Sequence, residues 1–361
     1  MKDKLTCILS FGVIFVFALL CFFLPKDDFS ESERRVLATF PETNAETIFS
    51  GKFSSDFEEY STDVFPFRDS FRAIKAFSAT KVFGKSDNNK LFIQDGHISK
   101  LEYPMSENLL DHATERFEFI HKTYLEGKTD NIYLSIIPDK NYFLNTLKFD
   151  YGALTDHVRK GMPYAEYVDI FPLLSLSDYY TTDSHWKQEE IDDVAEKLLS
   201  SMGKKQNGKF GYITLDVPFY GVYSGQAAIP TPPDTITYLT NDTLESCTIT
   251  NFDTGMPEEG FIYDLKKAES HDPYEMFLSG SSALLMIENP SNRNGEHLVV
   301  FRDSFASSLL PLMVGEYEKV TVVDIRYVPS NMVGAFVKDF TDTDVLFLYS
   351  ASMLNSSGAM K

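Results

Sequence analysis

The chain begins with one long apolar stretch. Residues 5–24 are apolar or small without interruption, and Pro25-Lys26-Asp27-Asp28 ends the run. About 20 apolar residues in a helix are enough to span the hydrocarbon core of a bilayer. We therefore expect a transmembrane anchor over residues 1–25.

The flanks of this stretch predict its orientation. Lys2 and Lys4 precede it, and lysines favour the cytoplasmic side of a membrane, so the rest of the chain should lie outside. A cleaved signal peptide is the alternative, but small residues do not stand at the spacing of a cleavage site. Leu20 before Cys21 is also too bulky for lipoprotein processing. We expect an uncleaved anchor that crosses the membrane once.

The polarity of the chain changes twice after the anchor. Residues 26–53 are rich in Ser, Glu and Thr, which indicates a stalk. Residues 54–82 have a helical pattern, interrupted at residues 64–68, and are rich in aromatic side chains. We expect one face of this helical segment to pack on the main domain. The acidic side chains between residues 56 and 63 disfavour contact with lipid.

Helix and strand patterns then alternate to the end of the chain. Asp95-Gly96 predicts the turn of a hairpin over residues 91–97. Further helices are expected over 107–125, 187–202, 306–314 and 331–340, and strands over 131–137, 167–170, 298–301, 319–325 and 345–349. Such alternation predicts an α/β fold, a parallel sheet flanked by helices. Residues 231–279 are rich in Thr, Asp and Pro and indicate a small insertion of loops and short strands, so the ectodomain should extend over residues 54–361.

Composition narrows the class of protein. The formal net charge is −20, which argues against binding to nucleic acid or adsorption to anionic lipid. Cys7 and Cys21 lie in the apolar stretch and leave Cys247 alone, so the ectodomain should hold no intrachain disulfide. An exported chain of this kind is typical of a bacterial, and in particular a Gram-positive, surface protein.

Asp183 and His185 form the first candidate for chemistry, in Thr182-Asp183-Ser184-His185-Trp186. In an extended segment, residues two apart point to the same face, so both side chains could enter one pocket with Ser184 pointing away. A carboxylate beside an imidazole fixes its tautomer and stabilises its protonated form, as a general base requires. The alternative is that Asp183 caps the helix expected over 187–202.

Ser304 is the second candidate. It follows the strand over 298–301, where a strand turns into a helix at the edge of the sheet. Free N–H groups at the start of a helix can stabilise an oxyanion beside a serine nucleophile. The alternative is that Asp303 or Ser304 is only the N-cap of that helix.

Two further segments could reach a ligand. Asp139 and Lys140 follow the strand over 131–137 at the carboxyl edge of the sheet, where open α/β sheets bind ligands. A salt bridge within the loop is the alternative for this pair. Residues 219–225, which include Gly221, form a small-residue loop that could present backbone N–H groups or could simply make a turn.

These motifs together resemble the DHHW family of bacterial surface proteins, which is similar to periplasmic alginate O-acetyltransferases with an SGNH-hydrolase-like domain. The matching pieces are Pro138-Asp139-Lys140, Thr182-Asp183-Ser184-His185-Trp186, residues 219–225, Val300-Phe301-Arg302-Asp303-Ser304-Phe305 and Val323-Asp324-Ile325-Arg326-Tyr327. The family name implies Asp-His-His-Trp, and Ser184 replaces one of the histidines here. The resemblance extends from about residue 54 to the end of the chain and implies an SGNH-hydrolase-like fold.

The resemblance also implies roles for the residues. Ser304 would be the nucleophile, His185 its general base and Asp183 the acid that orients His185. Arg326 and Tyr223 would bind substrate or support the oxyanion, for which the backbone near Gly221 is a further candidate.

The activity implied is O-acetyl transfer to a cell-surface polysaccharide. Because acetyl-CoA is cytoplasmic, a membrane-bound O-acyltransferase is the implied partner that supplies acetyl groups. The site requires no metal or organic cofactor. A carbohydrate acetylesterase with the same triad and a non-catalytic surface protein that binds glycan or a partner stay open as alternatives. A metal site on Asp183 and His185 is disfavoured, because the neighbouring sequence holds no further His or Cys.

Overall fold

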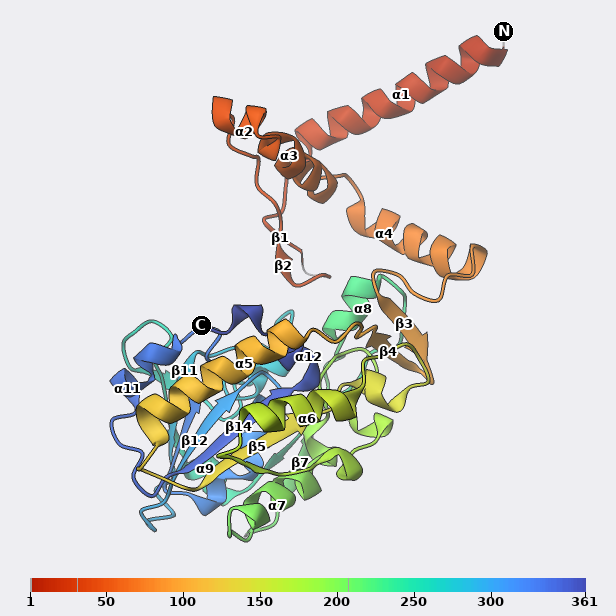
Figure 1. Cartoon of the computed structure of the whole chain (residues 1–361). Coiled ribbons are helices and arrows are strands. Elements are labelled where there is room, and N and C mark those ends of the chain that lie inside the picture. Colours follow the sequence, from red (N-terminus) through yellow and green to blue (C-terminus); the bar gives the residue numbers. More distant parts are fainter. Residues whose placement is uncertain (1, 31, 207) are drawn as a thin grey trace. The chain divides into compact units, whose positions relative to one another are not determined.

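The computed structural model describes residues 2–30, 32–206 and 208–361. The chain divides into two compact units (Figure 1). The N-terminal unit holds the chain up to Asn89 together with Ser224–Thr231, and the sheet unit holds Lys90–Tyr223 and Pro232–Lys361. The division between the two units falls after Asn89, while the expected ectodomain over residues 54–361 stays a prediction.

The N-terminal unit begins with a single long helix, α1 (Lys2–Phe23). Its stretch Lys4–Phe23 has a mean hydropathy of 2.7 and is long and apolar enough to cross a membrane. The elements that follow are β1 (Phe29–Ser30), β2 (Arg35–Val36), α2 (Ala45–Phe49), α3 (Lys52–Asp63), α4 (Arg68–Phe77) and a π-helical turn over Ser78–Val82. The break between α3 and α4 lies within residues 64–68, as the sequence predicts.

A mostly parallel sheet is the centre of the sheet unit. Within the described residues it has eight strands in the order β10-β9-β11-β13-β12-β14-β5-β6. The five strands from β13 to β6 are parallel, and β11, β9 and β10 continue the sheet in antiparallel fashion. Their bounds are β5 (Ile132–Ile137), β6 (Glu166–Tyr167), β9 (Thr248–Asn251), β10 (Glu258–Gly260), β11 (Leu284–Glu288), β12 (His297–Arg302), β13 (Lys319–Val323) and β14 (Asp344–Ser350). Part of the predicted insertion, β9 and β10, thus extends the edge of the main sheet.

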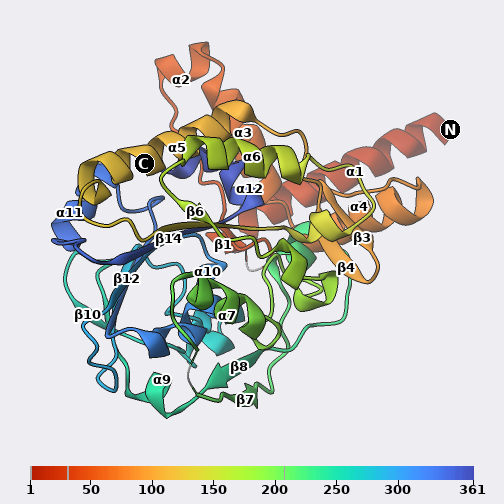
Figure 2. The ribbon, with the colours of Figure 1, turned by 60° about the horizontal axis from the view of Figure 1, so that its bottom comes forward.

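Two apolar layers cover the sheet because successive side chains of each strand point to opposite faces. On one face Val299, Phe301 and Phe347 pack beneath α5 (Glu107–Ile120) and α6 (Tyr151–Gly161). On the other face Val300 and Leu346 pack against α7 (Asp192–Ser201) and α10 (Ala306–Leu309). Figure 2 shows these helix pairs on opposite sides of the sheet. The predicted fold class is confirmed.

Several helices are shorter than the sequence pattern predicts. α10 ends at Leu309 instead of residue 314, because Pro311 has no N–H to continue the helix and a 3₁₀ turn follows over Leu310–Leu312. α7 begins at Asp192 after a 3₁₀ turn over Gln188–Glu190. α11 covers only Val333–Phe336.

Two hairpins stand apart from the main sheet. β3 (Leu91–Gln94) and β4 (His97–Lys100) pair in antiparallel fashion, and Asp95 and Gly96 between them both have positive φ angles, 50° and 80°. These angles suit the tight turn that Asp-Gly predicts. The second hairpin pairs β7 (Gly211–Thr214) with β8 (Thr237–Thr240).

Phe347 lies at the centre of the core and provides a test of this packing. Its ring is fully buried and stacks on Phe301 at 4.9 Å and 18°. We expect Phe347→Ala to lower the free energy of unfolding by ~3–5 kcal/mol, as large-to-small core substitutions do. Urea unfolding of the full-length protein in detergent measures this loss. Tyr212→Ala is the control, since Tyr212 is 64% exposed; an equal loss for both variants would contradict the packing described here.

Candidate active site

Three side chains from distant parts of the sequence meet at the carboxyl edge of the sheet. Nε2 of His185 lies 2.8 Å from Oγ of Ser304, and Nδ1 of His185 lies 2.6 Å from Oδ1 of Asp183. Asp183 is almost fully buried, while the His185 side chain is 14% exposed. In this order a carboxylate, an imidazole and a hydroxyl can activate the hydroxyl oxygen as a nucleophile.

A tight loop carries the acid and the base. Tyr179 and Trp186 form an antiparallel bridge, and the N–H of Tyr180 donates to the carbonyl of His185 at 3.1 Å. Residues 181–185 between them are bends and not an extended strand. Asp183 does not cap a helix, because α7 begins only at Asp192.

The expected orientation of Ser184 is therefore wrong. Its Oγ lies 3.5 Å from Oδ1 of Asp183 and 3.5 Å from Nδ1 of His185, beside the pair. The alternation rule holds for extended backbone, and this loop is bent. Asp183 and His185 meet because the loop folds back on itself.

The buried carboxylate of Asp183 is held by backbone as well as by His185. The N–H of His185 donates to Oδ1 at 3.0 Å, and the N–H of Val222, the first residue of α8 (Val222–Ala227), donates to Oδ2 at 2.8 Å. Each such bond to an ionised carboxylate favours its charged form. Together with Nδ1 of His185, these donors satisfy the buried carboxylate of Asp183.

Gly221 allows this close approach. A Cβ at this position would lie 2.3 Å from the Cβ of Asp183, so only glycine fits without a shift of the backbone. The N–H of Gly221 donates to Oγ1 of Thr182 at 2.9 Å. It is therefore engaged in this conformation, and an oxyanion role for the backbone near Gly221 stays a prediction.

Asp234 fixes the loop from the other side and is not evident from the sequence. Its carboxylate accepts from the backbone N–H groups of Thr181 and Thr182 at 2.8 and 2.7 Å. It also accepts from their hydroxyls at 2.8 and 2.5 Å. Asp234 lies in the Thr-, Asp- and Pro-rich insertion, where one acid among many carries no distinguishing signal.

An aromatic ring holds the plane of the imidazole. Tyr274 stacks on His185 with ring centres 3.9 Å apart and an angle of 10°. The Tyr274 hydroxyl lies 2.9 Å from Oγ of Ser308, to which Nε1 of Trp186 donates at 3.0 Å. A ring face also stabilises a protonated imidazole. Tyr274 is not evident from the sequence, because it lies about 90 residues from His185 and no local motif surrounds it.

Asp303 holds the turn that presents Ser304. Oδ1 of Asp303 accepts from the N–H of Phe305 at 3.1 Å, and Oδ2 accepts from the N–H and hydroxyl of Ser350 at 2.8 and 2.7 Å. These bonds tie the end of β12 to the end of β14. The N-cap of α10 is Phe305, without a side-chain cap bond, so neither Asp303 nor Ser304 caps this helix, and the hydroxyl of Ser304 bonds to His185.

The backbone of Ser304 offers one donor. Within residues 2–30, 32–206 and 208–361, its N–H group makes no hydrogen bond to another backbone carbonyl. An N–H group beside a serine nucleophile is suited to hold a developing oxyanion.

Lys140 is buried and binds the backbone of the loop, and a role of Lys140 in substrate binding stays a prediction. Its Nζ donates to the carbonyls of Tyr180 and Thr181 at 3.0 and 3.3 Å, and the side chain is 2% exposed. The ring centre of Tyr223 lies 5.2 Å from Nζ. Burial lowers the pKa of Lys140 to about 7, although the charges of Asp183 and Asp234 oppose the shift.

Asp139 and Arg326 each have a partner of their own. The hydroxyl of Tyr151 donates to Oδ2 of Asp139 at 3.4 Å, and burial together with the charge of Glu102 raises the pKa of Asp139 to about 7. Arg326 follows β13 and binds Asp324 through Nε at 2.9 Å and Nη2 at 2.5 Å. These two guanidinium donors are therefore engaged by Asp324. Substrate contact by Arg326 stays a prediction.

The fold and this arrangement define an α/β protein with a Ser-His-Asp site at the carboxyl edge of a parallel sheet. The sequence profile of the DHHW protein family matches residues 173–323, which include all three residues. The resemblance to the DHHW family that the sequence predicts is thereby confirmed. No curated protein matches the chain.

Solved structures agree on the fold. A DHHW family protein from Eubacterium siraeum matches with 18% identity over 75% of this chain and 95% of its own, at a TM-score of 0.56. PatB1 of Bacillus cereus matches with 16% identity over 74% of this chain and 97% of its own, at a TM-score of 0.60, and is also known with a sulfonyl adduct. The O-acetyltransferase domain of Pseudomonas putida AlgJ is more distant, with 12% identity over 73% of this chain and 92% of its own, at a TM-score of 0.46. The first two show that this chain shares the α/β fold of these proteins.

Gly221→Ala tests the packing against Asp183. The new methyl group must displace the acid or its loop, and a misplacement of about 1 Å can cost on the order of 100-fold in rate. We expect Ser304 to react with a sulfonyl fluoride about 100-fold more slowly in this variant, as mass spectrometry of the adduct would measure. Gly315→Ala is the matched control, because nothing lies within 4 Å of a Cβ there. Equal labelling rates for the two variants would contradict the role of Gly221.

Asp139→Asn tests the raised pKa of Asp139. Between its ordinary pKa of about 4 and its folded pKa of about 7, the folded chain keeps a proton that the unfolded chain has lost. The contribution of Asp139 to stability therefore falls as the pH rises through this range, while asparagine does not titrate. We expect the melting temperature of Asp139→Asn to rise relative to wild type from pH 4 to 7 and the difference to stay constant above that. A difference independent of pH would show that folding leaves the pKa of Asp139 at its ordinary value and would contradict the raised pKa.

Proposed function

We propose that this protein is a membrane-anchored O-acetyltransferase that acts outside the cytoplasm on a cell-surface polysaccharide. The observation that carries the proposal is the continuous hydrogen-bonded chain from Asp183 through His185 to Ser304. The likeness to PatB1, which is known with a sulfonyl adduct, supports a reactive nucleophile in this fold. An O-acetyltransferase domain also lies among the more distant structural relatives.

The first half of the reaction forms an acetyl–enzyme. Nε2 of His185 accepts the proton of Ser304 while Oγ attacks the carbonyl carbon of an acetyl ester. The N–H of Ser304 stabilises the oxyanion of the tetrahedral intermediate. When the intermediate collapses, the bond to the donor alcohol breaks, and that alcohol leaves with the proton from His185. The stacked ring of Tyr274 and the carboxylate of Asp183 stabilise the imidazolium between the two proton transfers.

The second half repeats these steps with a sugar as the acceptor. A sugar hydroxyl gives its proton to His185 and attacks acetyl-Ser304, and the collapse returns the proton to Oγ and releases the acetylated polysaccharide. With water in place of the sugar, the same steps would release acetate. A membrane-bound O-acyltransferase would supply acetyl groups from the cytoplasm.

The apolar helix α1 supports the location. Its length and its mean hydropathy of 2.7 suit a single membrane span. Lys2 and Lys4 place its first residues in the cytoplasm by the positive-inside rule. The sheet unit would then face outward, in a bacterium of the Gram-positive type.

Ser304→Ala provides the direct test. Incubation of the full-length protein in detergent with p-nitrophenyl acetate should add one acetyl group to Ser304 in the wild type, and mass spectrometry of peptides locates it. We expect Ser304→Ala to lose the adduct and to reduce turnover by on the order of 10³-fold or more, as the loss of a catalytic serine does.

Ser200→Ala, a change on the exposed end of α7, is the control and should behave as wild type. Addition of oligosaccharides then separates the activities, since a transferase yields acetylated sugar and an esterase yields only acetate. Turnover by Ser304→Ala at the wild-type rate, in folded protein, would overturn the catalytic role.

A further inference from the structure

Helix α4 in the N-terminal unit presents its apolar side outward. Apolar residues recur at helical spacing along α4 and continue into the turn that follows. The exposed members are Phe67 (62%), Phe71 (44%), Ile74 (59%), Phe77 (62%), Val82 (65%) and Phe83 (75%). We call these six residues the aromatic face. A contiguous apolar surface of this kind marks a site of interaction.

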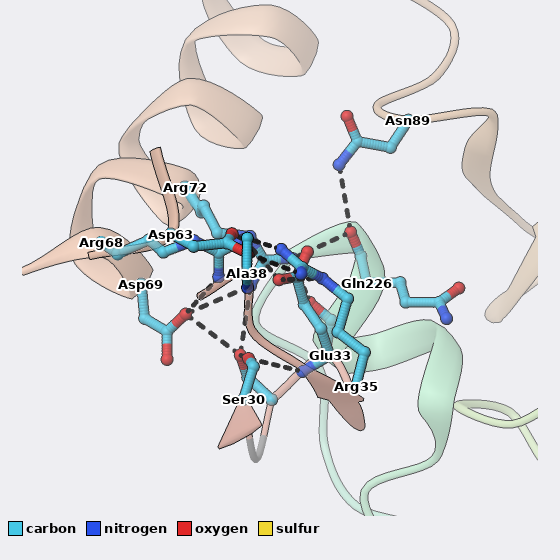
Figure 3. Close-up of polar contacts among 12 residues, drawn as sticks. Ser30, Glu33, Arg35, Ala38, Asp63, Arg68, Asp69, Arg72, Asn89 and Gln226 are labelled. Atoms are coloured by element: carbon cyan, nitrogen blue, oxygen red, sulfur yellow. Dashed lines mark hydrogen bonds and ion pairs between the residues drawn. The ribbon is translucent and has the colours of Figure 1, made fainter. Parts of the chain in front are cut away.

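The charged side of the same helix is turned inward and already has partners (Figure 3). Arg68 pairs with Glu33, and Arg72 pairs with Glu33 at 3.1 Å and donates to the carbonyl of Gly225 at 2.9 Å. Arg68 and Arg72 are only 15% and 14% exposed. A water-soluble amphipathic helix has the opposite arrangement, with its apolar side inward. Because the ion pairs fix the rotation of α4, its outward apolar side is part of the fold.

The aromatic face adjoins the apolar helix α1. Phe71 meets Phe17 of α1 edge-on with ring centres 5.8 Å apart, and Phe65 stacks on Phe17 at 5.2 Å and 7°. Phe17 of α1, which would lie among acyl chains, thus contacts Phe71 of α4 and Phe65, which precedes α4. This contact indicates that the aromatic face lies at the level of the lipid.

The charge of the segment fits an anionic surface. Residues 68–85 hold five basic residues (Arg68, Arg72, Lys75, Lys81 and Lys85) and one acidic residue, Asp69, in a chain whose net charge is −20. Lys75, Lys81 and Lys85 are exposed. Lysines beside an apolar face that enters the interface are the pattern of an amphipathic helix bound to anionic lipid. The acidic residues that disfavour lipid contact belong to α3, not to α4.

We propose that the aromatic face docks into the interfacial region of a bilayer that contains anionic phospholipid, with Lys75, Lys81 and Lys85 at the headgroups. α4 then lies in the plane of the membrane as a second attachment beside α1. The inference rests on the membrane anchoring included in the proposed function, but it does not depend on the acetyl-transfer chemistry.

Fluorescence of a single new tryptophan tests the proposal. The full-length Phe77→Trp variant is reconstituted into vesicles of phosphatidylcholine and phosphatidylglycerol whose acyl chains carry bromine. The only native tryptophan, Trp186, is fully buried, and its emission is subtracted with the wild-type protein. We expect the lipid bromines to remove most of the emission that the new indole adds. Tyr212→Trp, at an exposed position of the sheet unit, is the matched control and should keep its emission.

If Phe77→Trp does not fold, Phe67→Trp serves as a second reporter. Three results of the quenching experiment decide the proposal. Quenching that weakens when Lys75, Lys81 and Lys85 are changed to Glu together supports the anionic surface. Emission that aqueous iodide quenches but brominated lipid does not would show a face open to water and overturn the proposal. Emission protected from both quenchers would show a protein partner on this face and would overturn it as well. Acetyl transfer is not measured, so failure here leaves the proposed chemistry untouched.

Discussion

The buried carboxylate of Asp183 is the constraint on which the site depends. A carboxylate with almost no contact with water is stable only when hydrogen bonds replace its hydration. Nδ1 of His185 and the N–H groups of His185 and Val222 supply these bonds. The missing side chain of Gly221 lets that backbone come close enough.

Two further charged side chains hold the loop that carries Asp183. Asp234 clamps Thr181 and Thr182 on one side, and Lys140 binds the carbonyls of Tyr180 and Thr181 on the other. A loop held in this way cannot easily turn its acid toward water. The orientation of His185 toward Ser304 therefore depends on Asp234 and Lys140 as well as on Asp183.

Much of the fold could be predicted from the sequence because its strands are buried on both faces and read as continuous apolar runs. The central strands β5, β12 and β14 lie within one or two residues of their predicted ends. Helix lengths were less predictable, as Pro311 in the expected helix over 306–314 illustrates. Asp183, His185 and Ser304 could be found because short motifs surround them. Asp234 and Tyr274 could not, since they reach the site through long-range packing that leaves no local pattern.

The charges of residues 54–82 are divided unevenly between two helices. Four of the five acidic residues lie in α3, whereas α4 and the turn after it hold all four basic residues and only one acidic residue, Asp69. The aromatic rings of α3 pack with Phe40 and with one another, as Phe53 and Phe57 do at 5.8 Å. Only the structure separates these two helices and shows which side of α4 its ion pairs leave outward.

The position of β14 has a consequence for when the candidate site forms. β14 follows every other strand of the sheet in the sequence but lies inside the sheet, between β12 and β5. Ser350 at its end binds Asp303, the residue that shapes the turn of Ser304. A chain in which residues 344–350 have not yet joined the sheet would therefore carry Ser304 on an unformed turn. The hydrogen bond between Ser304 and His185 thus depends on the strand that leaves the ribosome last.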